Sequence, residues 1–492
     1  MIGIITALLL LIVGYIYKYY ENVRKYPPGP TPYPLIGNLF QFDAHRLHYY
    51  LEECHKKYGD IFTVWTPRPM VILMSYDTIK EGLVNKGDDL IGRMGRYPDN
   101  LFMSTDNGGV IFSQGENWRE QRRTAIHILR DFGMGKNVME EQVKVSLHEF
   151  MNHLNSIEDK NRVDFRWPIQ IFVANVINKT LFNYHYPFND CSRLMNYSDT
   201  LAAQIEEMRK NILVFVVMQF PFLSKVPLIG WKGEGQYRAS TAKLLDHVRE
   251  DVSKCIESYD ENEEPQSFVH SYMQKMGKTN QYLTIDQMVN VCGDFFLAGM
   301  ETTSTTLRWA MLHMANNVDV QDKIRAEIHS VLGKDREPSM KDRVNLPYTN
   351  ASVHEVQRHA NILPLNVIHR TVADTKIDGH SIPEDTLIMA QIYNVLRHGN
   401  LFKNPQEFRP ERFLMDDGKT PIKEVVEQLV PFSMGKRQCA GEGLTRMELF
   451  LGLATIIQKY RILPPLDGQL DLRPIEASIL LPRTNYLQMI PV

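Results

Sequence analysis

The residue with the clearest chemical potential is Cys439, which stands just before a segment of helical periodicity, from about Gly443 to Tyr460. The first N–H groups of a helix have no partner within the helix, and the helix dipole places partial positive charge at the same end. Both effects favour the reactive thiolate form of a cysteine. We therefore predict a thiolate at Cys439, although a lone cysteine is more commonly a small buried apolar side chain.

A second candidate lies within a long helical pattern over residues 284–316, which opens with the Thr-x-x-Gln spacing of a capping box. Glycine inside a helix costs roughly 1 kcal/mol relative to alanine, so Gly299 indicates a need for space beside the backbone. Glu301 can transfer protons, and Thr302 can donate and accept hydrogen bonds. The alternative is an ordinary helix whose threonine hydroxyl bonds to the preceding turn.

Two further pairs have the spacing that places side chains on one face of a helix. Glu355 and Arg358 are three residues apart, and Trp118 and Arg122 are four apart. An exposed ion pair contributes only about 0–1 kcal/mol, whereas breaking a buried one costs about 3–5 kcal/mol. We expect the first pair to support the fold.

The bulk composition is that of a globular protein. The 492 residues are 43% hydrophobic and 23% charged, with a formal net charge of −3, so we expect no nucleic-acid partner. The 5 cysteines contain no Cys-x-x-Cys pair, and their number is odd. This argues against a disulfide framework and for a reducing compartment.

The first residues predict a membrane anchor. Residues 2–17 carry no charge and are followed by Lys18, Arg24 and Lys25. At about 1.5 Å per helical residue they span most of a hydrocarbon core roughly 30 Å thick. No small-residue cleavage site follows, which favours a retained anchor over a cleaved signal peptide. The positive charges predict a cytosolic body, so the sequons should remain unglycosylated; these begin at Asn178, Asn196 and Asn350.

Prolines in residues 26–36 predict a stiff, extended stalk after the anchor. Further along, the patterns predict a helix over 49–58, a hairpin over 60–74 and short strands over 374–390. Residues 212–231 are apolar but interrupted by prolines, so they either dip into the membrane surface beside a substrate entrance or belong to the core.

The segment Pro431 to Gly441 resembles the Phe-x-x-Gly-x-Arg-x-Cys-x-Gly loop of the cytochrome P-450 superfamily. Its matching residues are Phe432, Gly435, Arg437, Cys439 and Gly441. The other matches, in the order of the family, are Trp118/Arg122, Ala298–Thr302, Glu355/Arg358 and Pro410–Phe413; Leu129–Lys136 is similar to the animal microsomal branch. The resemblance covers nearly the whole chain.

This resemblance implies haem b, bound through the sulfur of Cys439, whose thiolate favours cleavage of the O–O bond of dioxygen. It assigns contacts with the cofactor to Trp118, Arg122, Ala298, Gly299, His369, Phe432, Gly435, Arg437 and Gly441. Thr302 and Glu301 would supply the protons that this cleavage needs. Arg412 would join Glu355 and Arg358 in a buried network behind the haem loop.

The implied fold is mainly α with a small β lobe: a triangular helical body with haem between the Thr302 helix and the Cys439 loop. The implied organisation is an anchor (1–25), the stalk (26–36) and one catalytic domain (37–492). The activity is that of a monooxygenase acting on a small lipophile such as a fatty acid, steroid or foreign compound. By position in the family, Leu365, Val367 and Ile479 would face this substrate.

The electrons must come from another protein, because the sequence has no Gly-x-Gly-x-x-Gly strand–helix unit for a nicotinamide. The resemblance implies an NADPH-dependent flavoprotein reductase, with cytochrome b5 as a second donor, at the endoplasmic reticulum membrane. Arg119, Arg123 and Lys436 could form the docking face, although scattered basic residues are usually plain surface.

Two other functions fit parts of the pattern. One is a haem-thiolate isomerase that rearranges peroxides without a reductase, against which the Glu301–Thr302 pair argues. The other is a haem-binding sensor without catalysis, which needs no proton relay.

Overall fold

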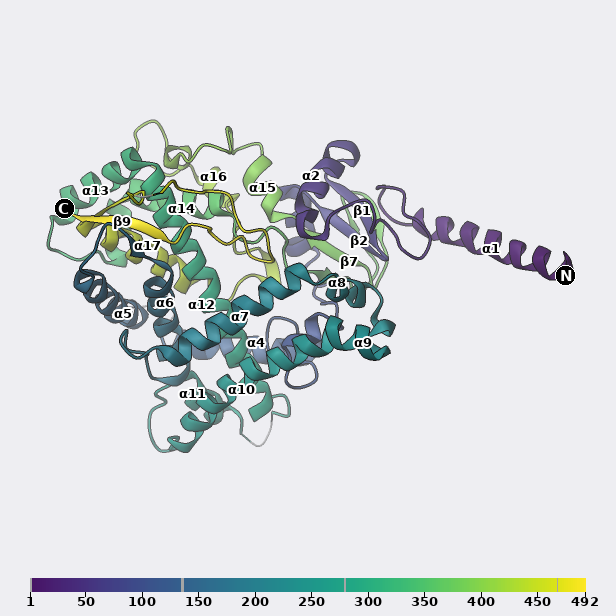
Figure 1. Ribbon diagram of the computed structural model, residues 1–492, viewed down its shortest axis with the longest axis horizontal. Helices are drawn as coiled ribbons and strands as arrows, with labels where there is room; N and C mark the ends of the chain where they lie inside the picture. Colours follow the sequence, from purple (N-terminus) through teal and green to yellow (C-terminus); the bar gives the residue numbers. More distant parts are fainter. Residues whose placement is uncertain (1, 134–136, 278–279, 467) are drawn as a thin grey trace.

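The computed structural model describes residues 2–133, 137–277, 280–466 and 468–492. Figure 1 shows a broad helical body, a small β-containing lobe beside α2, and α1 projecting away from that lobe. The predicted fold class, mainly α with a small β lobe, is confirmed.

The helices are α1 (Ile2–Val23), α2 (Leu47–Tyr58), α3 (Tyr76–Lys80), α4 (Gly115–Asp131), α5 (Asn137–Ser156), α6 (Arg166–Phe182), α7 (Ser192–Lys210), α8 (Ile212–Gln219), α9 (Pro227–Gly230), α10 (Gln236–Glu257), α11 (Phe268–Lys275), α12 (Ile285–Asn316), α13 (Val318–Leu332), α14 (Pro347–Ala360), α15 (Ile392–His398), α16 (Lys423–Glu427) and α17 (Glu442–Lys459). The strands are β1 (Ile61–Thr66), β2 (Arg68–Leu73), β3 (Val163–Asp164), β4 (His369–Arg370), β5 (Thr375–Ile377), β6 (His380–Ile382), β7 (Leu387–Ala390), β8 (Tyr460–Leu463) and β9 (Tyr486–Pro491). Part of the predicted Leu129–Lys136 motif, residues 134–136, lies outside the described residues.

The central helix α12 runs through the largest hydrophobic cluster and packs against α6 and α17. Its N-cap is the predicted one, because the Thr284 hydroxyl accepts a hydrogen bond from the Gln287 N–H at 3.2 Å. The reciprocal half of a capping box is not formed. The Gln287 amide oxygen instead accepts from the Gly109 N–H at 3.2 Å, so a tertiary contact has replaced the local one.

The main sheet has the strand order β1-β2-β7-β4. The predicted hairpin is β1 paired antiparallel with β2, and the predicted short strands include β7, which pairs parallel with β2. Met70–Leu73 of β2 and all of β7 are buried, which suits a sheet covered on both faces. This sheet positions β4, which carries His369.

The first helix, α1, extends beyond the uncharged residues 2–17 and lies within the predicted anchor (1–25); its described residues before Tyr19 are exposed. It is the one helix among the described residues that is long and apolar enough to cross a membrane. Its end is fixed to the body. The Tyr19 ring lies 5.8 Å from that of Trp65 on β1, and the hydroxyl groups of Tyr19 and Tyr20 donate to the carbonyls of Tyr33 and Pro32.

The stalk, residues 26–36, lies against the body. The carbonyl of Pro28 accepts a hydrogen bond from the Thr63 N–H at 3.2 Å, and a β-carbon on Gly29 would lie only 2.1 Å from the Thr63 carbonyl oxygen. The chain then reverses between Tyr33 and Gly37, which pair as an isolated bridge. The extended conformation is therefore limited to the first part of the stalk.

The apolar segment 212–231 forms α8, a 3₁₀ turn and α9, with prolines starting the second and third of these. Its side chains divide between buried and exposed positions, and its place at the membrane surface stays a prediction. Val214 and Val217 are buried, whereas the exposed large side chains are those of Ile212, Phe222, Val226, Leu228 and Trp231.

Candidate functional site

The loop before α17 is shaped so that Cys439 meets the start of that helix. The Cys439 N–H donates to the Phe432 carbonyl at 3.0 Å, and Gly441 is the N-cap. Gly435 has φ +77°, and a β-carbon there would lie 1.9 Å from the carbonyl oxygen of Leu83. Only glycine allows this approach.

The Cys439 side chain is exposed, whereas the 4 other cysteines are buried. Dense protein around it nevertheless raises the pKa of its thiol, while hydrogen bonds from the Gly441 and Glu442 N–H groups act in the opposite direction. The helix terminus therefore acts in the predicted direction, but desolvation outweighs it, and the net shift of the pKa is upward. A metal ion bound at sulfur would deprotonate the thiol.

Beside this loop, the predicted pair Trp118 and Arg122 on α4 meets Arg437. The Arg437 guanidinium carbon lies 3.8 Å from the centre of the Trp118 ring, and Arg122 donates to the Gln438 carbonyl at 2.5 Å. Burial, followed by repulsion from Arg93 and Arg122, lowers the pKa of Arg437 far below its usual range. The positive charges of Arg93, Arg122 and Arg437 therefore lie close together in a poorly solvated region.

Two observations indicate that an anion belongs here. The buried indole N–H of Trp118 has no hydrogen-bond partner among the described residues. The acid that most strongly offsets the charge of Arg93 is Asp99. Burial raises the pKa of Asp99 to about 6, so the Asp99 carboxylate is a poor counter-ion for the arginines. An unpaired buried donor costs about 1–3 kcal/mol, and a carboxylate would satisfy both it and the arginines.

His369 lies close to this cluster, on β4. Its Nδ1 atom is 2.9 Å from the Leu90 carbonyl oxygen, and burial, followed by repulsion from Arg93, lowers its pKa well below the usual value. A neutral ring that donates through Nδ1 to this carbonyl has Nε2 as an acceptor. A direct hydrogen bond from Nε2 to a carboxylate therefore requires the other tautomer or a protonated ring.

Arg93 is a member of the cluster that sequence reasoning missed. Its guanidinium donates to the Ile111 carbonyl at 3.0 Å and to the Ile368 carbonyl at 3.1 Å. It belongs to none of the sequence motifs, and its partners are distant in the chain. Tertiary folding alone brings it to Arg122 and Arg437.

The middle of α12 has the half-buried residues Ala298, Gly299, Glu301 and Thr302 in a largely buried helix. The Thr302 hydroxyl donates to the Ala298 carbonyl at 2.7 Å, as in the alternative interpretation, and therefore presents oxygen lone pairs to any other partner. A β-carbon on Gly299 would meet Ile177 of α6 at 3.4 Å. The missing side chain therefore leaves space toward α6, not a large opening.

The Glu301 carboxylate also contacts α6. Its Oε2 accepts from the Gln170 amide at 3.1 Å, and its Oε1 accepts from the Thr305 hydroxyl at 3.3 Å. No hydrogen bond joins Glu301 to Thr302 in the ranges that the structure covers. The two predicted catalytic side chains are neighbours in sequence but have separate partners.

One contact brings the two chemical motifs together. The hydroxyl groups of Thr303 on α12 and Thr445 on α17 lie 3.2 Å apart. The helix of the Glu301–Thr302 pair therefore crosses close to the start of the helix that follows Cys439.

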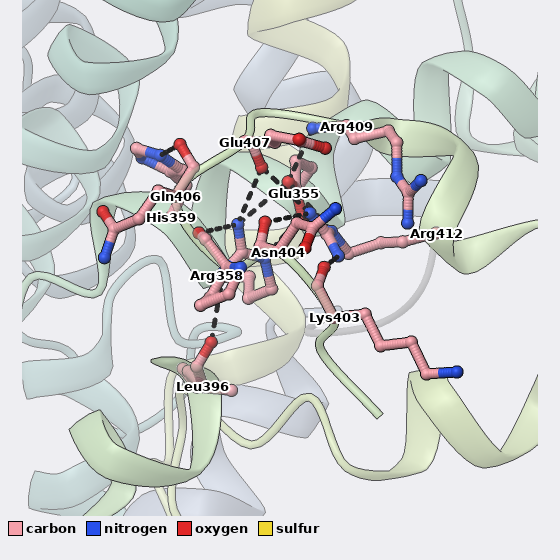
Figure 2. Close-up of polar contacts among 11 residues, drawn as sticks. Glu355, Arg358, His359, Leu396, Lys403, Asn404, Gln406, Glu407, Arg409 and Arg412 are labelled. Atoms are coloured by element: carbon pink, nitrogen blue, oxygen red, sulfur yellow. Dashed lines mark hydrogen bonds and ion pairs between the residues drawn. The ribbon is translucent and has the colours of Figure 1, made fainter. Parts of the chain in front are cut away.

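Figure 2 shows the predicted network of Glu355, Arg358 and Arg412, all of them buried. Glu355 accepts from Arg358 at 2.7 and 3.0 Å and from Arg412 at 3.0 Å. The arginines also donate to the carbonyls of Leu396, Lys403, Asn404, Pro405 and Glu407. The network joins α14 to the chain that leads toward the Cys439 loop.

The predicted pocket residues come from two segments. Leu365 and Val367 precede β4, and Ile479 lies between β8 and β9. The Leu480 N–H donates to the Ile362 carbonyl at 2.8 Å, which holds these segments together.

The predicted docking cations are each paired with an acid. Arg119 pairs with Glu116 at 2.5 Å, Arg123 pairs with Glu120 at 2.6 Å, and Lys436 pairs with Asp88. Their positive charge is thus partly neutralised.

Comparison with known proteins agrees with this geometry. The cytochrome P-450 family matches residues 27–489. Chicken (Gallus gallus) cytochrome P-450 2H1 is 36% identical over 508 aligned positions, with 100% of this chain and 99% of the relative covered. Mouse (Mus musculus) cytochrome P-450 2C44 is 34% identical, with 95% and 94% covered, and rat (Rattus norvegicus) cytochrome P-450 2F2 is 33% identical, with 99% of each covered. The chain therefore belongs to the cytochrome P-450 family and is a haem-thiolate monooxygenase.

Proposed function

We propose that the sulfur of Cys439 binds the iron of haem b and that the cluster of Trp118, Arg93, Arg122 and Arg437 holds its propionates. The observation that carries this proposal is the juxtaposition of an accessible thiol with an unpartnered indole N–H and buried arginines. Arg93, Arg122, Arg437 and the Trp118 N–H would bind the carboxylates, and His369 would take part as the protonated ring, which donates through Nδ1 to Leu90 and through Nε2 to a carboxylate. Ala298 and Gly299 would border the opposite face.

When bound, a thiolate-ligated haem supplies the activation of dioxygen. The residues of the chain contribute positioning and protons. Glu301 would carry protons from the α6 side of α12, and the Thr302 hydroxyl, fixed by its bond to Ala298, would accept a hydrogen bond from water or reactant. Phe432, Gly435 and Gly441 would shape the sulfur-bearing loop, with Glu355, Arg358 and Arg412 behind it.

A comparison of the wild type with Cys439→Ser tests the iron ligand. We expect the reduced, carbon monoxide-treated wild type to show the absorption of thiolate haem and to consume NADPH when a flavoprotein reductase is added. The serine variant should lose both. Full turnover of the variant would exclude Cys439 as the ligand.

We place the protein at the endoplasmic reticulum membrane, with α1 as a single anchor and residues 37–492 as a cytosolic catalytic domain. The sequons make this testable, because Asn196 is exposed whereas Asn178 is buried. In cells, we expect no endoglycosidase-sensitive mass at Asn196. A glycan there would place the body in the lumen.

The electron donor would be an NADPH-dependent flavoprotein reductase, with cytochrome b5 as a second donor. Arg119, Arg123 and Lys436 would contribute to its docking face. We expect electron transfer to slow as salt rises, because salt screens attraction between surface charges. A rate that stays constant across the salt series would remove this surface from the proposal.

The substrate would be a small lipophile that contacts Leu365, Val367 and Ile479. The exposed apolar side chains of α8 and α9 would lie at the membrane surface, beside the route by which it enters. Trp231 is 58% exposed, so bromolipid vesicles should quench its fluorescence, measured as the difference between wild type and Trp231→Phe. Equal quenching of the two proteins would place this segment away from lipid.

A further inference from the structure

Both carboxylate oxygens of Glu301 accept a hydrogen bond, one from α6 and one from α12 itself. Gln170 is 3% exposed and Thr305 is fully buried; the bond from Gln170 joins α6 to α12, the bond from Thr305 lies one turn along α12, and both are partly buried. Hydrogen bonds to a charged acceptor are stronger than neutral ones. The carboxylate is therefore held by contacts that must break before it can rotate.

The hydroxyl of Thr302 is held as well, by its bond to the Ala298 carbonyl. In the arrangement that the structure describes, a proton on Glu301 has no direct path to Thr302. The long-range partner in this arrangement is Gln170, which comes from another helix, 131 residues earlier in the chain.

The charge of Glu301 also acts on Arg308, which lies seven residues further along α12. Burial lowers the pKa of Arg308 to about 10, with the charge of Glu301 as the largest opposing influence. Arg308 donates to the Asn485 side chain at 2.6 Å, just before β9. The Glu301 carboxylate is thus held among polar groups of α6 and α12 and not by Thr302.

We propose that Gln170 is a positioning residue that, with Thr305, keeps the Glu301 carboxylate on the α6 side of α12, and that this hydrogen bond opens each time Glu301 delivers a proton toward Thr302. The inference deepens the proposed proton-transfer role of Glu301 and rests on it. Removing the Gln170 amide leaves Oε2 without a donor, so the carboxylate turns more readily toward the accessible side of α12. Proton delivery should then limit turnover less than it does in the wild type.

The hydrogen bond itself is tested without turnover. Gln170→Leu, Glu301→Ala and the double variant are compared with wild type by thermal unfolding of the haem-loaded protein. We expect the double variant to lose less stability than the sum of the single variants, because each removes the same bond. Additive losses would show that the two side chains do not interact.

The functional consequence is tested with solvent isotopes. NADPH consumption is measured in H₂O and D₂O with a flavoprotein reductase and dodecanoic acid as probe. The solvent isotope effect is the ratio of the rate in H₂O to the rate in D₂O. In Gln170→Leu, we expect the amount by which this ratio exceeds 1 to fall at least twofold. The matched control is Asn178→Leu, since Asn178 is a buried amide on the same helix with no hydrogen-bond partner in the described ranges. The control should keep the wild-type isotope effect.

The outcomes separate the inference from the function on which it rests. If Glu301→Ala keeps the wild-type isotope effect and the wild-type ratio of hydrogen peroxide to NADPH, Glu301 carries no proton and the proposed role fails. If Glu301→Ala changes both while Gln170→Leu matches wild type, the role stands and the positioning by Gln170 is wrong.

Discussion

The guanidinium of Arg437 lies over the ring of Trp118, with 3.8 Å between its central carbon and the ring centre. Arg437 belongs to the Cys439 loop and Trp118 to α4, so this contact fixes the loop to the helix. It also holds the unpartnered indole N–H beside a concentration of buried positive charge.

Replacing Trp118 with phenylalanine keeps a ring for Arg437 and removes the N–H donor. A hydrogen bond to a charged acceptor contributes about 1.5 kcal/mol, so the rate of haem loss should rise roughly tenfold. Transfer of haem to apomyoglobin measures that rate. Trp167→Phe is the control, and an unchanged rate in Trp118→Phe would mean that this N–H does not contact the cofactor.

Replacing Glu355 with glutamine leaves the cations of Arg358 and Arg412 buried without a carboxylate. We expect a loss of about 3–5 kcal/mol in the free energy of unfolding, measured with urea. Glu53→Gln is the control because Glu53 and its partner Lys56 are both 70% exposed, and we expect it to cost less than about 1 kcal/mol. Equal effects of the two substitutions would contradict a structural role for the network.

His313 should make the fold sensitive to acid. Its ring is buried, its Nε2 has no partner among the described residues, and burial, then repulsion from His359 and Arg358, lowers its pKa well below the usual value. Below about pH 6.5 the unfolded chain binds a proton that the folded chain does not, so stability falls by about 1.4 kcal/mol per pH unit.

His313→Leu should remove that loss, and urea unfolding at pH 5.5, 6.5 and 8 would measure it. The variant should gain stability relative to wild type only at the lower pH values. His398→Gln alters a histidine that is 43% exposed and should leave the slope unchanged. If the stability of His313→Leu fell with pH as steeply as that of the wild type, His313 would be protonated in the folded protein.

The acids beside the docking cations should weaken the attraction of a reductase. In Glu116→Gln/Glu120→Gln, Arg119 and Arg123 lose their partners, and the positive charge of this surface rises. We expect the KM for reductase to fall severalfold at low salt and the difference to disappear as salt screens it. Glu53→Gln, which changes a charge on α2, should have no such effect. An unchanged KM at low salt would contradict docking on this surface.

The sequence predicted what local pattern or a shared motif controls. The hairpin, the N-cap at Thr284 and the short loop at Gly435 depend on residues close together in the chain. Arg93 and Gln170 could not be found in this way, because their contacts are with residues far away in sequence. The net upward shift of the Cys439 thiol pKa could not be predicted either, because helix position is visible in sequence and desolvation is not.

The aromatic contacts at the base of α1 have a mechanical consequence. Hydrogen bonds from Tyr19 and Tyr20, with the ring of Trp65 beside them, restrict rotation of the first helix relative to the β lobe. A long apolar helix tilts when the bilayer is thinner than its span. Bilayer thickness would therefore set the orientation of the whole catalytic domain relative to the membrane. It would also set the distance of α8 and α9 from the lipid.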